Sequence, residues 1–493
     1  MKKIHFLIFL LPLMMLSCQE QQLSIFSPEL AQPATLDPNG GKWRTVTGVV
    51  PQSIEVVTPA DSSSDFFKNE MLEIERLSLA RTPEQIAQAE YWGSGSVLRW
   101  NQIARELVAK YNIPPEEGSI PNPAKPVASP PWAARAYAML SVAQYDALVT
   151  TWHYKFHFNR AAPAVFNPSL SLLLPKNDLP SYPSEDAAIA EASFTILKAL
   201  FPLEESYLKD LAQQHQFSRL VAGANLRSDL TAGANVGTRV ANRVLTRAKT
   251  DRMSLASDPD DTWLNIAVPY EPWRSLEPTP TKPVLPLYGQ VKTWFDSAAV
   301  FATIPAAPPL IGSAEFQADL NKVAAYTRSG VRDYWRMADF WADGSGTFTP
   351  IGHWNAIAED YIREEQLNEL RTARVLALLN RSAMDAGIAC WHTKYKYFLP
   401  RPSQIDPTIK TAAGIPNFPA YTSGHSTFSM ASATILAHLF PDHSQEIISM
   451  ADEAGLSRVV SGIHYEFDNT EGKKCGRAVG NLAIEWALLD GAD

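Results

Sequence analysis

Three short segments near the C-terminus carry the residue types that bind a multiply charged anion. In chain order, the candidate site residues are Lys394, Arg401, Ser423, Gly424, His425, Arg458, His464 and Asp468. The two arginines have planar, forked donors that match the oxygens of a tetrahedral anion. The glycine lets the backbone approach closely, and the alanine-rich run after it predicts a helix whose free N–H groups would point at the anion. This set of residues predicts a site for a phosphate-like anion.

The spacing of the two histidines and the aspartate indicates their roles. His464 and Asp468 are four positions apart, so they share a face if this stretch is helical. A carboxylate in that position fixes the tautomer of the ring and raises its basicity. We expect His464 to attack or bind the central atom of the anion, Asp468 to support it, and His425 to be the acid–base partner.

The order and spacing of the segments, rather than any single motif, favour a function. A lysine and an arginine beside a proline are common at solvated helix ends. A Ser-Gly-His is usually a turn, and a Ser-Arg before a helix is often only a cap. The structural alternative to a working site is a site that was once catalytic and is now idle.

Taken together, the segments resemble the superfamily that joins vanadium-dependent haloperoxidases, type-2 phosphatidic acid phosphatases and bacterial class A acid phosphatases. The stretch 462–469, which reads Gly-Ile-His-Tyr-Glu-Phe-Asp-Asn, is more similar to the haloperoxidase branch, as are Trp391 and Phe418. The resemblance covers roughly residue 90 to the end. One departure is Thr422, where the family usually has a proline; it removes no catalytic group but leaves the stiffness of that loop open.

The resemblance implies an enzyme that uses vanadate as its cofactor and hydrogen peroxide to oxidise halide to hypohalous acid, with a small organic acceptor left open. It implies that His464 is the single protein ligand of vanadium and that His425 contacts the apical hydroxide and assists proton transfers. The implied contacts to the vanadate oxygens come from Lys394, Arg401, Ser423, the N–H group of Gly424, and Arg458.

Two aromatic residues and one carboxylate complete the candidate site. Trp391 and Phe418 would wall a dry, polarisable pocket for halide; the alternative is that both are core aromatics of a helical bundle. Within the family, chloride oxidisers and some bacterial iodide oxidisers carry Phe at the position of Phe418, while bromide oxidisers tend to carry His. The halide therefore stays open. Asp343 is the candidate carboxylate for pairing with Arg401.

Two further functions stay open. Five-coordinate vanadate resembles the transition state of phosphoryl transfer, so the same residues serve a soluble acid phosphatase of the superfamily. In that enzyme His464 would form a phosphohistidine, and His425 would protonate the leaving alcohol and then activate water. A surface lipoprotein with a relic site is the third reading.

An internal repeat aligns the chain with itself, without a gap, at one fixed offset. From 180 to 242, about a third of the positions are identical to those one offset later. The first copy differs at the positions that matter: Ala162 replaces Arg401, Glu185 replaces Gly424, Asp186 replaces His425 and Asn225 replaces His464 (464 − 225 = 239). Two carboxylates thus stand where an anion would bind. We infer an all-α fold of two related helical bundles, with the active site in the C-terminal one.

Composition and the N-terminus restrict the partners. A net charge of −9 over 493 residues argues against nucleic acid or an anionic membrane surface as a partner. Lys2-Lys3 leads an apolar run that is too short to span a bilayer, and Cys18 after a small residue resembles a lipoprotein signal. This predicts an exported periplasmic or outer-membrane/cell-surface lipoprotein that meets the membrane only through a lipid anchor; because Met15 is not the favoured residue three before that cysteine, an ordinary signal peptide stays open. Cys390 and Cys475 are either a disulfide or two buried thiols.

The predicted organisation has five parts. They are a signal peptide at 1–18, a flexible tether at 19–65, a degenerate helical bundle at 66–250, a Pro- and aromatic-rich connection at 251–350 and the catalytic bundle at 351–493. Apolar residues spaced three and four apart dominate both bundles, and strand signals are scarce.

Overall fold

The computed structural model describes residues 33–113, 129–176, 178–277 and 281–492. These residues form an all-α fold, as the sequence predicted, and no strand occurs among them. None of the described helices is both long and apolar enough to cross a membrane. The predicted signal peptide and the lipidation site at Cys18 lie outside the described residues.

Two sets of helices follow one another with the same lengths and the same gaps. The first set is α4 (Pro130–Phe158), α5 (Pro163–Phe166), α6 (Glu185–Leu200), α7 (Glu205–Val221) and α8 (Arg227–Ala248). The second set is α13 (Glu369–Tyr397), α14 (Pro402–Ile405), α15 (Gly424–Leu439), α16 (Ser444–Val460) and α17 (Glu466–Ala487). Every bound of the second set lies 239 residues after its counterpart. An internal duplication predicts this pattern.

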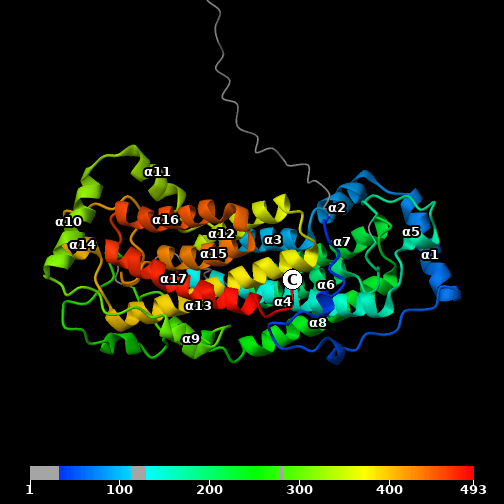
Figure 1. Cartoon of the computed structure of the whole chain (residues 1–493), viewed down its shortest axis with the longest axis horizontal. Coiled ribbons are helices and arrows are strands. Elements are labelled where there is room, and N and C mark those ends of the chain that lie inside the picture. Colours follow the sequence, from blue (N-terminus) through cyan, green and yellow to red (C-terminus); the bar gives the residue numbers. More distant parts are fainter. Residues whose placement is uncertain (1–32, 114–128, 177, 278–280, 493) are drawn as a thin grey trace, which may run out of the picture.

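Helices α4 and α13 form the centre of the fold, and both are buried along most of their length. They run antiparallel, so Trp152 near the end of α4 and Glu369 at the start of α13 line the same cavity. Between these ends, Asn380 donates a hydrogen bond of 2.9 Å to Ser141, the residue at the equivalent position of the other helix. The C-terminal end of α4, which leads into α5, and that of α13, which leads into α14, therefore lie at opposite ends of the elongated molecule (Figure 1).

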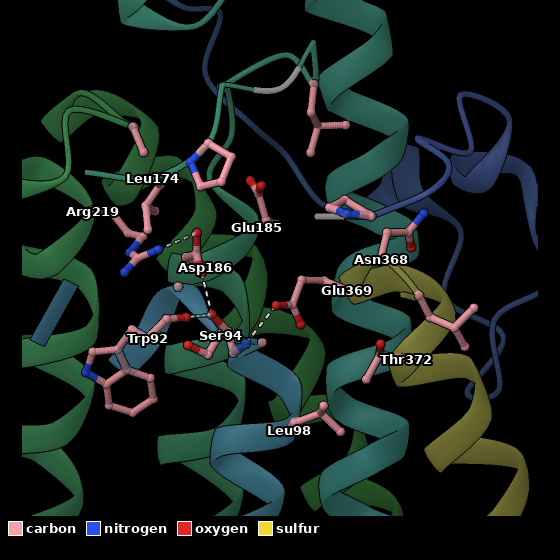
Figure 2. A pocket seen from close by; sticks show the side chains of 18 of the residues that line it. Trp92, Ser94, Leu98, Leu174, Glu185, Asp186, Arg219, Asn368, Glu369 and Thr372 are labelled. Atoms are coloured by element: carbon pink, nitrogen blue, oxygen red, sulfur yellow. Dashed lines mark hydrogen bonds and ion pairs between the residues drawn. The ribbon is translucent and has the colours of Figure 1, made fainter. Parts of the chain in front are cut away.

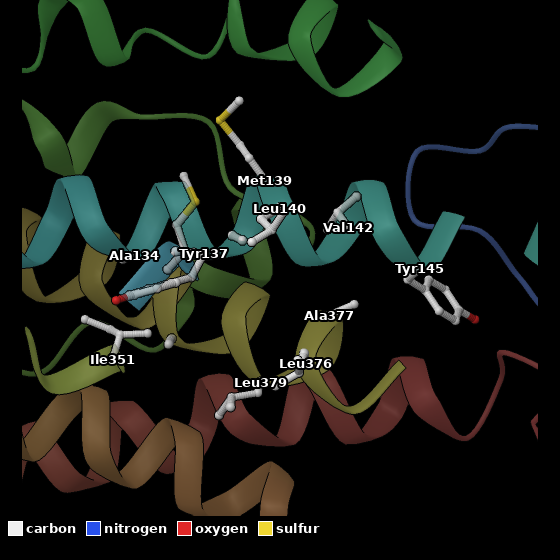
Figure 3. Close-up of a cluster of buried hydrophobic side chains, with 14 of the residues drawn as sticks. Ala134, Tyr137, Met139, Leu140, Val142, Tyr145, Ile351, Leu376, Ala377 and Leu379 are labelled. Carbon is white, nitrogen blue, oxygen red and sulfur yellow. The ribbon is translucent and has the colours of Figure 1, made fainter. Parts of the chain in front are cut away.

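One hydrophobic core joins the two sets of helices. Tyr137 and Leu140 of α4 belong to the same buried cluster as Leu376 and Leu379 of α13 and Ile351 of α12 (Thr349–Glu364), and Figure 3 shows these side chains between the helices. Burying a large apolar side chain contributes about 1.5–3 kcal/mol. The two sets are therefore held together by apolar packing along α4 and α13.

The remaining helices surround this central pair. Those before α4 are α1 (Asp65–Leu79), α2 (Pro83–Gly93) and α3 (Ser96–Tyr111), and those before α12 are α9 (Ser297–Ala302), α10 (Ala314–Arg328) and α11 (Arg332–Phe340). The segment before α9 packs on the end of α13. There, the indole N–H of Trp391 and the hydroxyl of Tyr395 both donate to the carbonyl of Val284, at 3.1 and 2.8 Å. This segment thus fixes the end of α13 that carries the candidate site.

The prediction of a flexible tether is wrong for residues 33–64. Trp43, Val49 and Ile54 are buried in the main core. The carboxylate of Asp146, inside α4, accepts hydrogen bonds of 2.7 and 2.8 Å from the backbone N–H groups of Val46 and Thr47. A buried carboxylate is costly unless it is hydrogen-bonded, so this contact holds the segment against α4. The polar, proline-containing composition of the segment hid these few anchoring residues.

Two glycines allow a close approach of helices within each set. A Cβ at Gly476 of α17 would lie 2.4 Å from the carbonyl oxygen of Thr427 in α15. A Cβ at Gly237 of α8, the equivalent position, would lie 2.3 Å from the carbonyl oxygen of Ala188 in α6. Because both obstacles are helix backbone, a methyl group fits only if a helix moves.

We expect Gly476→Ala and Gly237→Ala each to lower the free energy of unfolding by about 1–3 kcal/mol, the usual cost of overpacking a core. Chemical denaturation of the purified protein measures this. The matched control is Gly344→Ala, because a Cβ at Gly344 meets nothing within 4 Å. An unchanged midpoint for both helix variants would show that these helices adjust freely.

Candidate active site

Lys394 lies near the end of α13 and is fully buried. Its ammonium group donates to the backbone carbonyls of Pro419, Ala420 and Thr422 at 2.9, 2.8 and 2.5 Å. These carbonyls belong to the loop that leads into α15. The lysine therefore carries a buried positive charge and also fixes the loop that presents the next site residues.

Arg401 lies just after α13, where Phe398 ends the helix in a left-handed conformation (φ 46°). Its side chain is fully buried. Nη2 donates to the carbonyl of Phe418 at 2.9 Å, while Nη1 donates to the carbonyl of Ile463 at 2.8 Å and to Nε2 of His464 at 2.9 Å. Since a guanidinium can only donate, Nε2 of His464 is the acceptor and carries the lone pair.

His464 and Asp468 form the predicted pair, but they do not share a helix face. His464 precedes Tyr465, the N-cap of α17, and Asp468 is the third residue of that helix. The carboxylate of Asp468 turns back, so its Oδ2 lies 2.7 Å from Nδ1 of His464 and accepts the N–H of Tyr465 at 3.2 Å. This capping geometry places the proton of the ring on Nδ1.

The state of the His464 ring follows from its surroundings. Burial, and then the charges of Arg401 and Lys394, hold the pKa of His464 well below its ordinary value. The ring is therefore neutral, with its Nε2 lone pair facing the buried cations. Such a nitrogen can act as a nucleophile or as a ligand to a metal centre.

Ser423, Gly424 and His425 begin α15. Ser423 is its N-cap, with Oγ accepting the N–H of Ser426 at 3.3 Å, and its own N–H donates to the carbonyl of Asp468 at 3.1 Å. Gly424 is the first helical residue. The N-terminus of α15 thus lies beside the His464–Asp468 pair, where the partial positive charge of the helix favours an anion.

His425 has a nitrogen without a partner. Among the described residues, its buried Nε2 makes no hydrogen bond. Burial and the charge of Arg458 hold the pKa of His425 well below its ordinary value, and hydrogen bonding to the backbone of Trp341 and Ala342 only partly opposes this. His425 is therefore neutral and has a nitrogen available to exchange a proton with a bound molecule.

Arg458 lies at the end of α16. Its Nε donates to Oγ of Ser457 at 2.8 Å, and its Nη2 donates to the carbonyl of Ala338 at 2.6 Å. Asp343 does not pair with Arg401, which corrects the sequence prediction. Asp343 Oδ1 instead lies 3.1 Å from Nδ1 of His353, and its charge acts on Arg458. The guanidinium of Arg401 instead donates to the backbone carbonyls of Phe418 and Ile463 and to His464.

The site holds more buried positive charge than it can balance. Burial lowers the pKa of Lys394 to about 7 and those of Arg401 and Arg458 to about 10. Burial also raises the pKa of Asp468 to about 7, and Oδ1 of this residue has no partner among the described residues. A bound oxyanion would supply the missing negative charge. The donor set and the unpartnered Nε2 of His425 fit a tetrahedral or five-coordinate oxyanion such as vanadate or phosphate.

Trp391 and Phe418 lie together beside the cations. Their ring centroids are 5.1 Å apart. The Phe418 ring lies 5.0 Å from the ammonium of Lys394 and 5.2 Å from the guanidinium carbon of Arg401. Trp391 is fully buried, and its Nε1 is already bonded. The two rings form an apolar wall next to the charged groups.

Several groups of the site carry no sequence signal. The carbonyls of Phe418, Pro419, Ala420 and Ile463 hold the two cations, and every residue type has a carbonyl. Thr422 takes the place of the usual proline. Its carbonyl oxygen and its hydroxyl oxygen each lie 3.6 Å from the sulfur of Cys390. Cys390 and Cys475 are both buried free thiols in this structure.

Residues 375–490 match the model of the PAP2 superfamily. Every anion-site residue described above lies inside this range. This range holds most of α13 and all of α14, α15, α16 and α17. Within it, the candidate site combines a buried imidazole, three cations and a helix N-terminus.

The curated relatives fall into two groups. The vanadium chloroperoxidase of Curvularia inaequalis is 26% identical over 423 residues, which is 70% of this chain and 66% of that protein. The acid phosphatase of Zymomonas mobilis is 39% identical over 61 residues, 12% of this chain and 23% of that protein. The non-specific acid phosphatase of Salmonella typhi is 34% identical over 70 residues, 14% and 26%. The chain spans less than two thirds of the length of each relative.

Solved structures show the same fold. A bacterial vanadium-dependent iodoperoxidase superposes with a TM-score of 0.61 at 21% identity, covering 79% of this chain and 96% of that chain. The apo form of a bacterial vanadium-dependent chloroperoxidase superposes with a TM-score of 0.53 at 14% identity, covering 73% and 94%. At these identities the likeness establishes the helical fold.

We expect Asp468→Asn to weaken orthovanadate binding by about 10–100-fold, because the ring of His464 loses the partner that fixes its tautomer. Isothermal calorimetry with orthovanadate measures the affinity. Asp229→Asn is the matched control. Asp229 is the equivalent residue of the first set, and its carboxylate accepts the N–H of Leu226 at 2.7 Å. Equal affinities in wild type and Asp468→Asn would contradict this role.

Proposed function

We propose that this protein is a vanadate-dependent haloperoxidase that oxidises halide with hydrogen peroxide to hypohalous acid. The observation that supports this proposal most strongly is the neutral ring of His464, whose Nε2 lone pair lies among three buried cations. His464 would be the single protein ligand of vanadium. The groups that would hold the vanadate oxygens are Lys394, Arg401, Arg458, Ser423 Oγ and the N–H of Gly424. When bound, vanadate supplies Lewis acidity that activates peroxide without a change of oxidation state.

His425 is the proton-transfer group of this proposal. Its low pKa keeps the ring neutral at neutral pH, so Nε2 could take a proton from incoming peroxide and give it to a departing hydroxide, which would leave as water. Asp468 keeps His464 in the ligand tautomer. Lys394 and the two arginines would stabilise negative charge on the reacting oxygens, in a site where burial makes each interaction strong.

The aromatic wall supports halide chemistry. Trp391 and Phe418 offer a dry, polarisable surface beside Lys394, where a weakly hydrated anion loses little on leaving water. The same rings would crowd a large organic phosphate. The long match to a vanadium chloroperoxidase points in the same direction.

A second candidate is a soluble acid phosphatase, and the two short matches to acid phosphatases favour it. His464 Nε2 would attack phosphorus, and His425 would protonate the leaving alcohol and then activate water. These matches are more identical than the chloroperoxidase match, but they cover only 12% and 14% of the chain. For that reason haloperoxidase chemistry is the preferred proposal.

The deciding test is peroxide-dependent oxidation of iodide and bromide by the purified protein, with and without orthovanadate. We expect turnover that requires orthovanadate and is lost in His464→Ala, because the variant has no ligand for vanadium. Asn225→Ala, at the equivalent position of the first set, should retain full activity.

The same preparations are assayed for hydrolysis of a phosphate monoester. Hydrolysis that orthovanadate inhibits, without halide oxidation, would assign the protein to the phosphatase function. Silence in both assays would favour a relic site.

We expect Phe418→Ala to lower kcat/KM for halide about tenfold, since water then reaches Lys394 and the apolar surface for halide is lost. The backbone carbonyl that holds Arg401 remains, so the affinity for orthovanadate should change little. Steady-state halide kinetics and vanadate calorimetry separate the two quantities. Unchanged halide kinetics would make Phe418 a packing residue only.

A further inference from the structure

A cavity of about 660 Å³ lies between the first helical set and residues 359–372, near the C-terminal end of α4. It is the counterpart of the anion site, because the equivalents of several site residues line it. These lining residues are Ala162, Glu185, Asp186, Arg219 and Asn225, which stand for Arg401, Gly424, His425, Arg458 and His464. Figure 2 shows Glu185, Asp186 and Arg219 on the wall of this cavity. Ala162 leaves free the space that an arginine takes in the second set.

The cations of this cavity are already balanced by resident carboxylates. Lys155, the equivalent of Lys394, lies 2.6 Å from Oε2 of Glu185. Arg219 lies 4.0 Å from Asp186, which also accepts from Ser96 Oγ at 2.5 Å. Arg219 and His215 hold the pKa of Asp186 below its usual range although burial opposes this. An incoming oxyanion would therefore meet the carboxylates of Glu185 and Asp186 beside these two cations.

A third carboxylate comes from the other helical set. Glu369, the first residue of α13, lines the same cavity and accepts the N–H groups of Ser96 and Val97 at 2.7 and 3.0 Å. Burial, and then the charges of Asp186 and Glu185, raise the pKa of Glu369 to about 7. His215 is neutral because burial lowers its pKa. Three carboxylates, those of Glu185, Asp186 and Glu369, thus lie on the cavity wall, and of the two neighbouring cations only Arg219 lines it.

The remaining charged residues of the lining are three basic ones (Arg99, Lys176 and Arg363) and three acidic ones (Glu359, Asp360 and Glu364), so they leave this excess of carboxylates unchanged. Arg363 is 2.9 Å from the carboxylate of Glu359, and Arg99 donates to the carbonyl of Tyr91 and to Gln102 at 3.1 and 2.8 Å. Lys176 is exposed to solvent.

The rest of the lining is apolar and suits an organic body. Leu172, Leu174 and Leu367 are partly exposed and line the cavity, and more of its surface is apolar than polar. The volume lies within the range of about 300–1,000 Å³ that small-molecule sites occupy. The cavity therefore combines an acidic group of side chains with an apolar wall.

We propose that this cavity binds a small organic cation, with its protonated amine at Glu185, Asp186 and Glu369 and its apolar part against the leucines. The proposal does not depend on the reaction of the second set, because the site shares no side chain with it. The exchange of four residues has thus converted an oxyanion site into an amine site on the same scaffold.

The test is isothermal calorimetry of the full-length protein with three probes of equal shape: phenethylamine, 2-phenylethanol and phenylacetate. We expect saturable one-to-one binding of phenethylamine, about tenfold or more tighter than the alcohol, and no binding of the carboxylate. Phenylacetate binding as tight as the amine, or no heat from the amine at millimolar concentration, would overturn the proposal.

Two variants test the location. Glu185→Gln should weaken phenethylamine about tenfold, because it removes one carboxylate and leaves Lys155 unbalanced. Ala162→Arg introduces the residue that stands at the equivalent position 401 of the second set. It should abolish binding by filling the cavity, while all three carboxylates are kept in the sequence. His425→Asn, at the opposite end, should leave the amine affinity unchanged. Unchanged affinity in both first-set variants would overturn the assignment to this cavity.

Discussion

The antiparallel packing of α4 and α13 is the constraint on which the rest of the structure depends. Both helices are buried along most of their length, so each must be covered on all sides, and each covers much of the other. The contact between Asn380 and Ser141, equivalent residues of the two helices, fixes their register. Because the helices run in opposite directions, their lysine-bearing ends lie far apart along the molecule (Figure 1). The two sites could therefore diverge in charge without disturbing one another.

The charge of each site follows from which partner its buried lysine has. Lys394 donates only to backbone carbonyls, which hold it in place but cancel none of its charge. Lys155 occupies the same position and has a carboxylate, Glu185, at 2.6 Å. Burying a charge is costly unless it is paired, so Lys155 is satisfied within the protein, whereas the charge of Lys394 would be balanced by a bound anion. One difference at the start of a helix, Glu185 in the first set and Gly424 in the second, thus decides whether the buried lysine has a carboxylate partner.

The sequence was sufficient to predict the helical class and the residues that gather at the anion site. Lys394, Arg401 and His464 meet as their spacing suggested, because long helices and tight caps translate spacing into position. Other features depend on contacts that residue type does not encode. The backbone carbonyls around Arg401 made a partnership with Asp343 unnecessary, and His464 reaches Asp468 through a helix cap rather than along a helix face. The buried anchors of residues 33–64 were hidden in a polar segment.

The reaction of the anion site depends on its surroundings more than on its charged groups. A neutral imidazole lone pair among cations suits attack on phosphorus and coordination of vanadium equally, since both centres pass through or adopt five-coordinate geometry. What differs is the space beside the cations. Trp391 and Phe418 cover one side of that space with apolar surface. The centroid of the Phe418 ring lies 5.0 Å from the ammonium of Lys394. Such a wall favours a small, weakly hydrated anion over an extended phosphate ester, because the ester would have to displace both rings.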